Sequence, residues 1–196
     1  RLLAGLLVPE AGEIRVLGLD PVREGDALRQ RLGYMPQQFG LYEDLSVQEN
    51  LNLYADLRGV LEPERSPTFE RLLAFTDLAR FTARPAGKLS GGMKQKLGLA
   101  CALLGTPDVL LLDEPGVGVD PISRRALWKM VRELAQGGMT VLWSTAYLDE
   151  AELCDHVLLM ADGEVRTSGT PATLMGAMAS RCWLLEAGEL DGRERR

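Results

Sequence analysis

Two carboxylates follow an apolar run in the middle of this sequence. Residues 109–112 are Val-Leu-Leu-Leu, and Asp113, Glu114 and Pro115 come directly after them. Such a run is typical of a parallel strand with both faces covered, and catalytic groups gather where these strands end. A carboxylate at that edge can hold Mg²⁺, and its neighbour can polarise a water molecule. We therefore predict that Asp113 is a metal ligand and that Glu114 is a catalytic residue.

A second candidate site lies earlier in the chain, in the stretch Leu-Ser-Gly-Gly-Met-Lys-Gln at residues 89–95. Ser90 can cap a helix, because a serine side chain accepts a hydrogen bond from a free backbone N–H group of the first turn. Gly91 and Gly92 have no side chain that would keep a ligand away from the backbone. A helix N-terminus attracts anions through its N–H groups and its dipole. This stretch therefore predicts a phosphate-binding site.

Both stretches resemble sequence motifs of ABC transporter ATP-binding domains. Residues 89–95 resemble the signature loop of this family, and residues 110–115 resemble its Walker B strand. Two further motifs occur in the family's order: Gly-Val-Asp at 118–120 resembles the D-loop, and Tyr-Met-Pro-Gln at 34–37 resembles the Q-loop. Within the family, the sequence is most similar to the first ATPase half of the tandem-ATPase subunit of bacterial multidrug exporters.

The resemblance implies a role for each matching residue, with ATP and Mg²⁺ as the bound groups. Gln37 would contact both the metal and the attacking water, Asp113 would hold Mg²⁺, and Glu114 would act on the water. The residues that would bind nucleotide are Ser90, Gly91, Gly92, Gln95 and Asp120.

The implied fold class is α/β, a P-loop NTPase with a parallel sheet, flanking helices and an α-helical subdomain. This sequence lacks the Walker A strand and loop of that fold. The pattern Gly-x-x-x-x-Gly-Lys-Ser/Thr occurs nowhere in the sequence, and the Gly-Lys pair at 87–88 is followed by leucine. The apolar residues at 2–7 predict the end of the helix that should follow this loop, so we expect a truncation just after Walker A. Residues 1–196 alone are then expected to lack activity.

Four segments are expected. They are a partial ATPase core at 1–43, a helical subdomain at 44–88, the rest of the core at 89–170 and a C-terminal extension at 171–196. Ser46 and Glu49 predict a capping box at the start of a helix. Asp120 with Pro121 predicts the start of another. Further helices are expected at 21–30, 94–104 and 147–153. Strands are expected at 13–18, 31–37, 139–143 and 157–160. A hairpin turn is expected at 162–163, and loose structure after 171.

Composition excludes several classes of protein. A hydrophobic content of 46% and a charged content of 26% are ordinary for a globular protein. The net charge of −6 opposes nucleic-acid binding, for which a basic surface is expected. No apolar run approaches the roughly 20 residues that span a bilayer, so a membrane role would need a partner. The 3 cysteines are widely spaced, which suits a reducing compartment and no metal site.

The resemblance also implies partners and a location. The parent protein would be the ATPase subunit of a bacterial ABC exporter, coupling ATP binding and hydrolysis to efflux through separate transmembrane permease subunits. It would work with a second ATPase domain, in tandem or as a dimer, at the cytoplasmic face of the inner membrane. The helical subdomain at 44–88 would dock onto the permease.

One position departs from the family pattern. Residues 143–151 match the family's switch motif, but Ala146 stands where that motif has a histidine. His156, further along, is expected to be structural. Two alternatives to an active exporter ATPase follow: a regulatory nucleotide-binding half with weak hydrolysis, and a soluble ABC ATPase that acts outside transport. The acidic balance and the absence of a basic arm or coiled-coil insert count against the second alternative.

Overall fold

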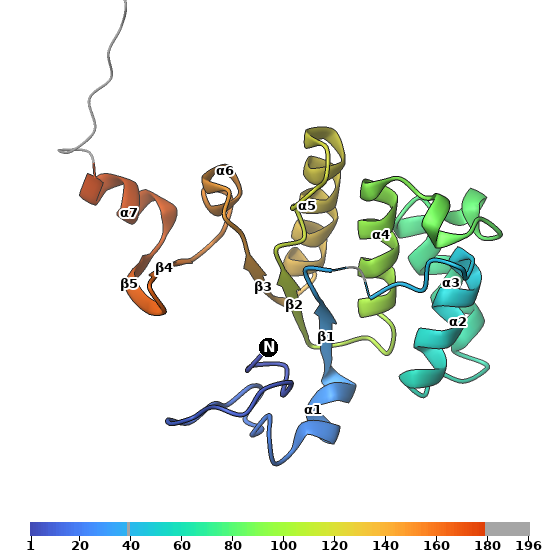
Figure 1. The fold of residues 1–196 in the computed structure, drawn as a ribbon, viewed down its shortest axis with the longest axis horizontal. Helices are drawn as coiled ribbons and strands as arrows, with labels where there is room; N and C mark the ends of the chain where they lie inside the picture. The colour runs from blue at the N-terminus through green and yellow to red at the C-terminus, as the bar shows by residue number, and fades with distance from the viewer. Residues whose placement is uncertain (39, 179–196) are drawn as a thin grey trace, which may run out of the picture. The chain divides into compact units, whose positions relative to one another are not determined.

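The computed structural model describes residues 1–38 and 40–178, and the chain divides into two units at 1–145 and 146–196 (Figure 1). The first unit contains a 3-stranded sheet with helices packed on it. The second unit contains a 2-stranded sheet and two helices in its described part. The residues singled out for chemistry lie in the first unit, apart from Ala146.

The sheet of the first unit is parallel and has the order β1 (Leu32–Met35), β2 (Val109–Asp113), β3 (Thr140–Ser144). The central strand β2 is buried from Val109 to Leu112, which confirms the prediction of a covered strand. Because the three strands run in the same direction, their carboxyl ends meet at one edge. Asp113 is the last residue of β2 and therefore lies at this edge.

Five helices accompany this sheet: α1 (Gly25–Arg31), α2 (Val47–Leu57), α3 (Arg65–Phe75), α4 (Gly91–Ala102) and α5 (Pro121–Gln136). Short 3-10 turns span Ala79–Phe81 and Ala86–Lys88. Figure 1 shows α2, α3 and α4 grouped to one side of the sheet, and α4 contacts α2, α5 and β1. The apolar faces of α2, α3, α4 and α5 form the main core with β2, which includes the fully covered Val47, Leu51, Leu97, Leu99 and Leu110. Leu28 of α1 belongs to a second, smaller cluster.

Two helix starts follow the predicted capping chemistry. Ser46 accepts a hydrogen bond from the backbone N–H of Glu49, whose carboxylate accepts one from the backbone N–H of Ser46 at 2.8 Å. Asp120 caps α5, with Pro121 as the first helical residue. Each cap satisfies backbone N–H groups that a helix start otherwise leaves without a partner.

Two of the three predictions for the N-terminal segment were wrong, and the helix predicted at 21–30 is present with a later start. Residues 2–5 form a turn rather than a helix end, and the expected strand at 13–18 is reduced to a bridge between Val16 and Leu19. The helix expected from 21 begins at Gly25. Gly5, Gly12 and Leu17 have φ values of 67°, 85° and 54°, a left-handed backbone that regular helices and strands do not contain.

Strand β3 forms where a strand was expected at 139–143, but it is only partly buried. Its residues alternate between exposed and half-buried, and the side chain of Leu142 is 43% exposed. Within the described part of the chain, β3 pairs along one edge only, with β2. An outer strand of this kind shows one face and one edge to solvent.

The second unit contains α6 (Leu148–Ala151), β4 (Val157–Ala161), β5 (Glu164–Gly169) and α7 (Pro171–Met178). Strands β4 and β5 form an antiparallel hairpin, as predicted, and its turn residues Asp162 and Gly163 have φ values of 54° and 78°. Helix α7 stands where loose structure was expected, and residues 179–196 of the expected extension lie outside the described residues. None of the described helices is long and apolar enough to cross a membrane.

Replacing Gly33 by alanine is expected to lower the free energy of unfolding by about 1–3 kcal/mol, because it overfills the contact of β1 with its neighbours. A Cβ atom at this position would lie 2.6 Å from the backbone oxygen of Ala102 and 2.9 Å from the Leu110 side chain. Urea unfolding of the first unit measures the loss. Gly25→Ala is the control, since its Cβ would meet the flexible Arg29 side chain at 3.3 Å. Equal stability of the two variants would contradict the prediction.

Candidate active site

The carboxylate of Asp113 lies between hydroxyl groups from both neighbouring strands. The register of β2 and β3 places Ser144 opposite Asp113, and the Ser144 hydroxyl donates to Asp113 Oδ1 at 3.0 Å. From β1, on the other side, the Tyr34 hydroxyl donates to Asp113 Oδ2 at 3.4 Å. One donor therefore holds each oxygen of this carboxylate.

Glu114 leaves the strand in a sharp turn. Its φ of 50° is left-handed, and its backbone N–H donates to the Ser144 hydroxyl at 2.9 Å and to the Ser144 carbonyl at 3.2 Å. The Gln37 amide donates to Glu114 Oε2 at 2.7 Å. Gln37 follows β1, so the structure brings together the three residues predicted for metal binding and catalysis, Gln37, Asp113 and Glu114.

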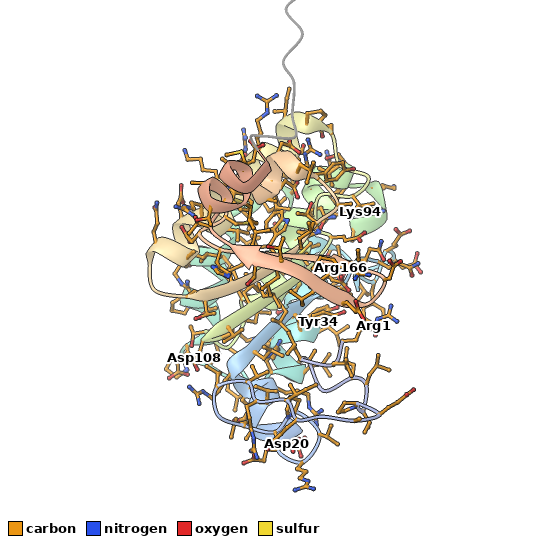
Figure 2. All side chains as sticks on the ribbon, turned by 90° about the vertical axis from the view of Figure 1, so that its left-hand side faces the viewer. Arg1, Asp20, Tyr34, Lys94, Asp108 and Arg166 are labelled. Atoms are coloured by element: carbon orange, nitrogen blue, oxygen red, sulfur yellow. The ribbon has the colours of Figure 1, made fainter. Side chains whose placement is uncertain are left out.

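Tyr34 is a neutral donor in this arrangement. Burial raises the pKa of its hydroxyl, and the negative charge of Asp113 raises the pKa further, whereas a hydrogen bond with Arg1 acts in the opposite direction. Figure 2 shows Tyr34 and Arg1 close together in the first unit. Because its pKa lies above the ordinary value, Tyr34 keeps its proton at neutral pH and donates a hydrogen bond to Asp113.

The edge has the chemistry of a magnesium site. Carboxylate and amide oxygens come from Asp113, Glu114 and Gln37, and hard oxygen ligands are those that Mg²⁺ prefers. Within residues 1–38 and 40–178, no three His, Cys, Asp or Glu side chains gather as a metal cage. One or two carboxylates, completed by water and substrate phosphates, is the usual way in which proteins hold Mg²⁺. These residues therefore fit Mg²⁺ held together with a phosphate ligand.

The signature stretch forms the start of α4. Ser90 is the cap residue, and its side chain accepts from the backbone N–H of Met93 at 3.3 Å. Ser90 and Gly91 are exposed, whereas Gly92 is buried. One turn later, Lys94, which Figure 2 labels, forms an ion pair with Glu43 at 2.6 Å. The helix thus begins with exposed backbone N–H groups, as phosphate binding requires.

The start of α4 lies against the start of α5. A Cβ atom on Gly91 would be 3.4 Å from the backbone oxygen of Gly118, and one on Gly92 would be 2.4 Å from the side chain of Ser123. Only glycine fits at position 92 without displacing Ser123. The structure therefore brings the signature and D-loop stretches into contact.

Asp120 uses its carboxylate within the protein. It accepts hydrogen bonds from the backbone N–H groups of Ile122 at 3.1 Å and Ser123 at 2.9 Å. Hydrogen bonds from Ser123, the largest contribution, hold the pKa of the Asp120 carboxyl below its ordinary value. Asp120 is also exposed, so it can cap α5 and still face a ligand or partner.

Gln95 is placed differently from the other predicted nucleotide-binding residues. Its side chain is 2% exposed and lies in the interior, with Oε1 buried and without a hydrogen-bond partner in the described part of the chain. A side chain so covered offers no polar surface to a ligand, so this geometry opposes a direct nucleotide contact. The sequence assigned no role to Ser144 or Tyr34, although both lie in motif stretches, because only the pairing register of the strands brings their hydroxyls to Asp113.

Comparison with known proteins relates this chain to one family. Residues 1–117 match the family model described as ABC transporter. The chain is 65% identical to the probable multidrug ABC transporter ATP-binding protein YbhF of Escherichia coli, over 94% of this chain and 32% of that protein. It is 40% identical to the daunorubicin resistance ATP-binding protein DrrA3 of Streptomyces coeruleorubidus, over 97% of this chain and 61% of that protein. The chain thus spans about a third of YbhF, since the matched share is 32%.

Solved structures give the same result. The ATP-binding subunit of an ABC transporter superposes with a TM-score of 0.78 at 32% identity, covering 91% of this chain and 75% of that one. A dimeric ATP-binding cassette, MJ0796 bound to ADP and Pi, superposes with a TM-score of 0.76 at 26% identity, covering 87% and 78%. These matches confirm the predicted α/β fold of a P-loop NTPase. On these grounds the chain belongs to the ABC transporter family.

Proposed function

We propose that this chain forms part of the ATP-binding subunit of a bacterial multidrug exporter, which hydrolyses ATP to drive efflux through separate membrane subunits. The observation that carries the proposal is the contact of Gln37 with Glu114 beside Asp113, at the carboxyl edge of the parallel sheet. The relatives named as a multidrug ABC transporter ATP-binding protein and a daunorubicin resistance ATP-binding protein support this function.

Each polar residue at the edge would have a separate task in hydrolysis. Asp113 would hold Mg²⁺, which supplies positive charge to the phosphates during phosphoryl transfer. Glu114 would accept a proton from the attacking water as a general base. Gln37 would orient the Glu114 carboxylate through its 2.7 Å hydrogen bond and offer its amide oxygen to the metal.

A second ATPase domain would complete the site. We assign contact with the nucleotide of that second domain to Ser90, Gly91, Gly92 and Asp120, which lie at the starts of α4 and α5. Exposed N–H groups at a helix start favour a phosphate of the opposite domain. Gln95, being buried, would support α4 from inside. The dimeric form of the related cassette MJ0796 is consistent with this pairing.

Helices α2 and α3 would carry the docking surface for the permease subunits, at the cytoplasmic face of the inner membrane. A cavity of about 520 Å³ opens between them. Arg65 forms an ion pair with Asp56 at 2.8 Å at this cavity. The lining residues are Gln48, Asn52, Asp56, Glu62, Arg65, Ser66 and Phe69.

The test is phosphate release from ATP by the complete ATP-binding protein, reconstituted with its membrane subunits in liposomes. We expect hydrolysis that requires Mg²⁺, is abolished by EDTA and depends on the membrane subunits. Hydrolysis at an equal rate with and without those subunits would favour a soluble ABC ATPase instead. Absence of Mg²⁺-dependent hydrolysis altogether would contradict the proposed activity.

Ala146 favours a second candidate, a site of this half that hydrolyses ATP slowly. An alanine side chain ends at Cβ, so it supplies no polar group where the family's switch motif has histidine. Loss of one donor to a developing charge costs on the order of a hundredfold in rate. Ala146→His in the complete protein is therefore expected to raise hydrolysis at this site by up to about this factor. Single-turnover hydrolysis, with the second ATPase domain inactivated, measures the change.

ATP affinity separates this effect from a change in binding. A contact made mainly in the transition state raises the rate and leaves ground-state binding nearly the same. Ala146→Leu, which adds bulk without a polar group, is the control and should leave the rate unchanged. A rate in the unmodified protein already as high as in Ala146→His would show that the site is not weakened.

A further inference from the structure

We infer that Ser144 and Tyr34 are positioning residues of the proposed hydrolytic site, which fix the orientation of the Asp113 and Glu114 carboxylates through their hydroxyl groups. This inference rests on the proposed ATP hydrolysis. Neither residue would touch the nucleotide. Both would act through the two acids that do the chemistry.

The Ser144 hydroxyl serves both acids at once. It has one proton to donate, and Asp113 Oδ1 at 3.0 Å is a better acceptor than the Leu112 carbonyl at 3.4 Å. Its oxygen then accepts the backbone N–H of Glu114 at 2.9 Å. A single side chain thereby links the orientation of the metal-binding carboxylate to the backbone that carries the general base.

The backbone at Glu114 needs such support. Its φ of 50° lies in the left-handed region, which non-glycine residues adopt at an energetic cost and only where their surroundings determine it. Ser144 supplies the acceptors for the Glu114 N–H with its hydroxyl and its carbonyl oxygen. Loss of the hydroxyl leaves the carbonyl at 3.2 Å as the weaker remaining contact.

Tyr34 completes the arrangement from the opposite strand. Its hydroxyl lies 3.4 Å from Asp113 Oδ2, a long hydrogen bond that restrains the carboxylate weakly from the side opposite Ser144. A carboxylate has about four acceptor positions, and two donors leave the others for a metal ion or its bound water. The longer distance predicts that Tyr34 contributes less than Ser144.

The experiment compares Ser144→Ala, Ser144→Thr and Tyr34→Phe in the complete ATP-binding protein. Removing a hydrogen-bond partner of a metal ligand typically lowers metal affinity or activity about 10- to 100-fold. We expect Ser144→Ala to lower kcat and weaken Mn²⁺ binding within this range, with a smaller effect for Tyr34→Phe. Ser144→Thr keeps the hydroxyl, so its kcat and Mn²⁺ affinity should stay close to those of the unmodified protein. The probe is Mn²⁺ with a non-hydrolysable ATP analogue, measured by electron paramagnetic resonance, so the affinity does not depend on turnover.

Two controls make the result decisive. Tyr42→Phe, at an exposed tyrosine before α2, removes a matching hydroxyl and should leave Mn²⁺ affinity unchanged. Glu114→Gln tests the assigned general base: normal ATP hydrolysis in this variant would mean that another group accepts the proton. Absence of Mg²⁺-dependent hydrolysis in the unmodified protein would instead overturn the proposed function. If Glu114→Gln is inactive while Ser144→Ala keeps normal kcat and Mn²⁺ affinity, only the positioning role fails. Equal losses of kcat and Mn²⁺ affinity in Ser144→Thr and Ser144→Ala would also overturn the positioning role. If Ser144→Ala does not fold, Tyr34→Phe still tests the contact with Asp113 Oδ2.

Discussion

Glu114→Gln in the complete ATP-binding protein is expected to lower hydrolysis at this site by about 10²- to 10⁴-fold, the range that general-base catalysis contributes. Glutamine keeps the size of the side chain and an oxygen that can accept the Gln37 hydrogen bond, but it cannot take a proton from water. Binding of Mg·ATP should change little, because the lost interaction belongs to the transition state. Single-turnover hydrolysis and calorimetric ATP binding give the two quantities.

Glu10→Gln is the matched control for this substitution. It makes the same chemical change at an exposed glutamate of the N-terminal segment, so hydrolysis should stay at the normal rate. Hydrolysis by Glu114→Gln within a few-fold of the unmodified protein would mean that another group accepts the proton. Loss of ATP binding in the same variant would place Glu114 among the binding residues instead.

Ser90→Arg is expected to abolish turnover at the site that the signature stretch is proposed to complete. Ser90 is exposed at the start of α4, where a phosphate of the second ATPase domain would approach. An arginine side chain fills that space, and it removes the cap on the Met93 N–H at the same time. Loss of a serine cap typically costs about 1 kcal/mol of stability, which is too little to stop turnover by itself.

Two control variants separate the blocked approach from the lost cap. Ser90→Ala removes the hydroxyl without adding bulk, so it should retain much of the activity and show only the stability loss. Ser168→Arg adds the same side chain at an exposed serine of β5 and should leave turnover normal. ATP-dependent pairing of the two ATPase domains, monitored by size-exclusion chromatography, should fail in Ser90→Arg only. Normal ATPase activity of Ser90→Arg would remove the signature stretch from the mechanism.

Local chemistry made part of this site predictable. The buried run at 109–112 with two acids behind it describes both a strand and its exposed end, and the structure has β2 there. The caps at Ser46 and Asp120 were predictable for the same reason, since a helix start is determined by neighbouring residues. The Q-loop strand also appears within two residues of its predicted end.

Features set by distant partners could not be read from the sequence. The hydroxyls of Tyr34 and Ser144 reach Asp113 only because β1 and β3 pair with β2 in one particular register. The burial of Gln95 depends on helix packing around α4. Because α4 is apolar on more than one face, its sequence does not indicate which face is buried. In the segment before α1, left-handed residues interrupt the backbone where the apolar pattern alone suggested regular structure.

The left-handed turn at Glu114 has a consequence for protein engineering. Glycine or asparagine adopts this backbone more readily than glutamate, so either would relieve local strain at position 114. A selection for heat resistance alone would favour these replacements and discard the proposed catalytic base with them. At this position a substitution that raises thermal stability lowers the rate of hydrolysis. A stabilised version of the protein therefore has to gain its stability elsewhere in the chain.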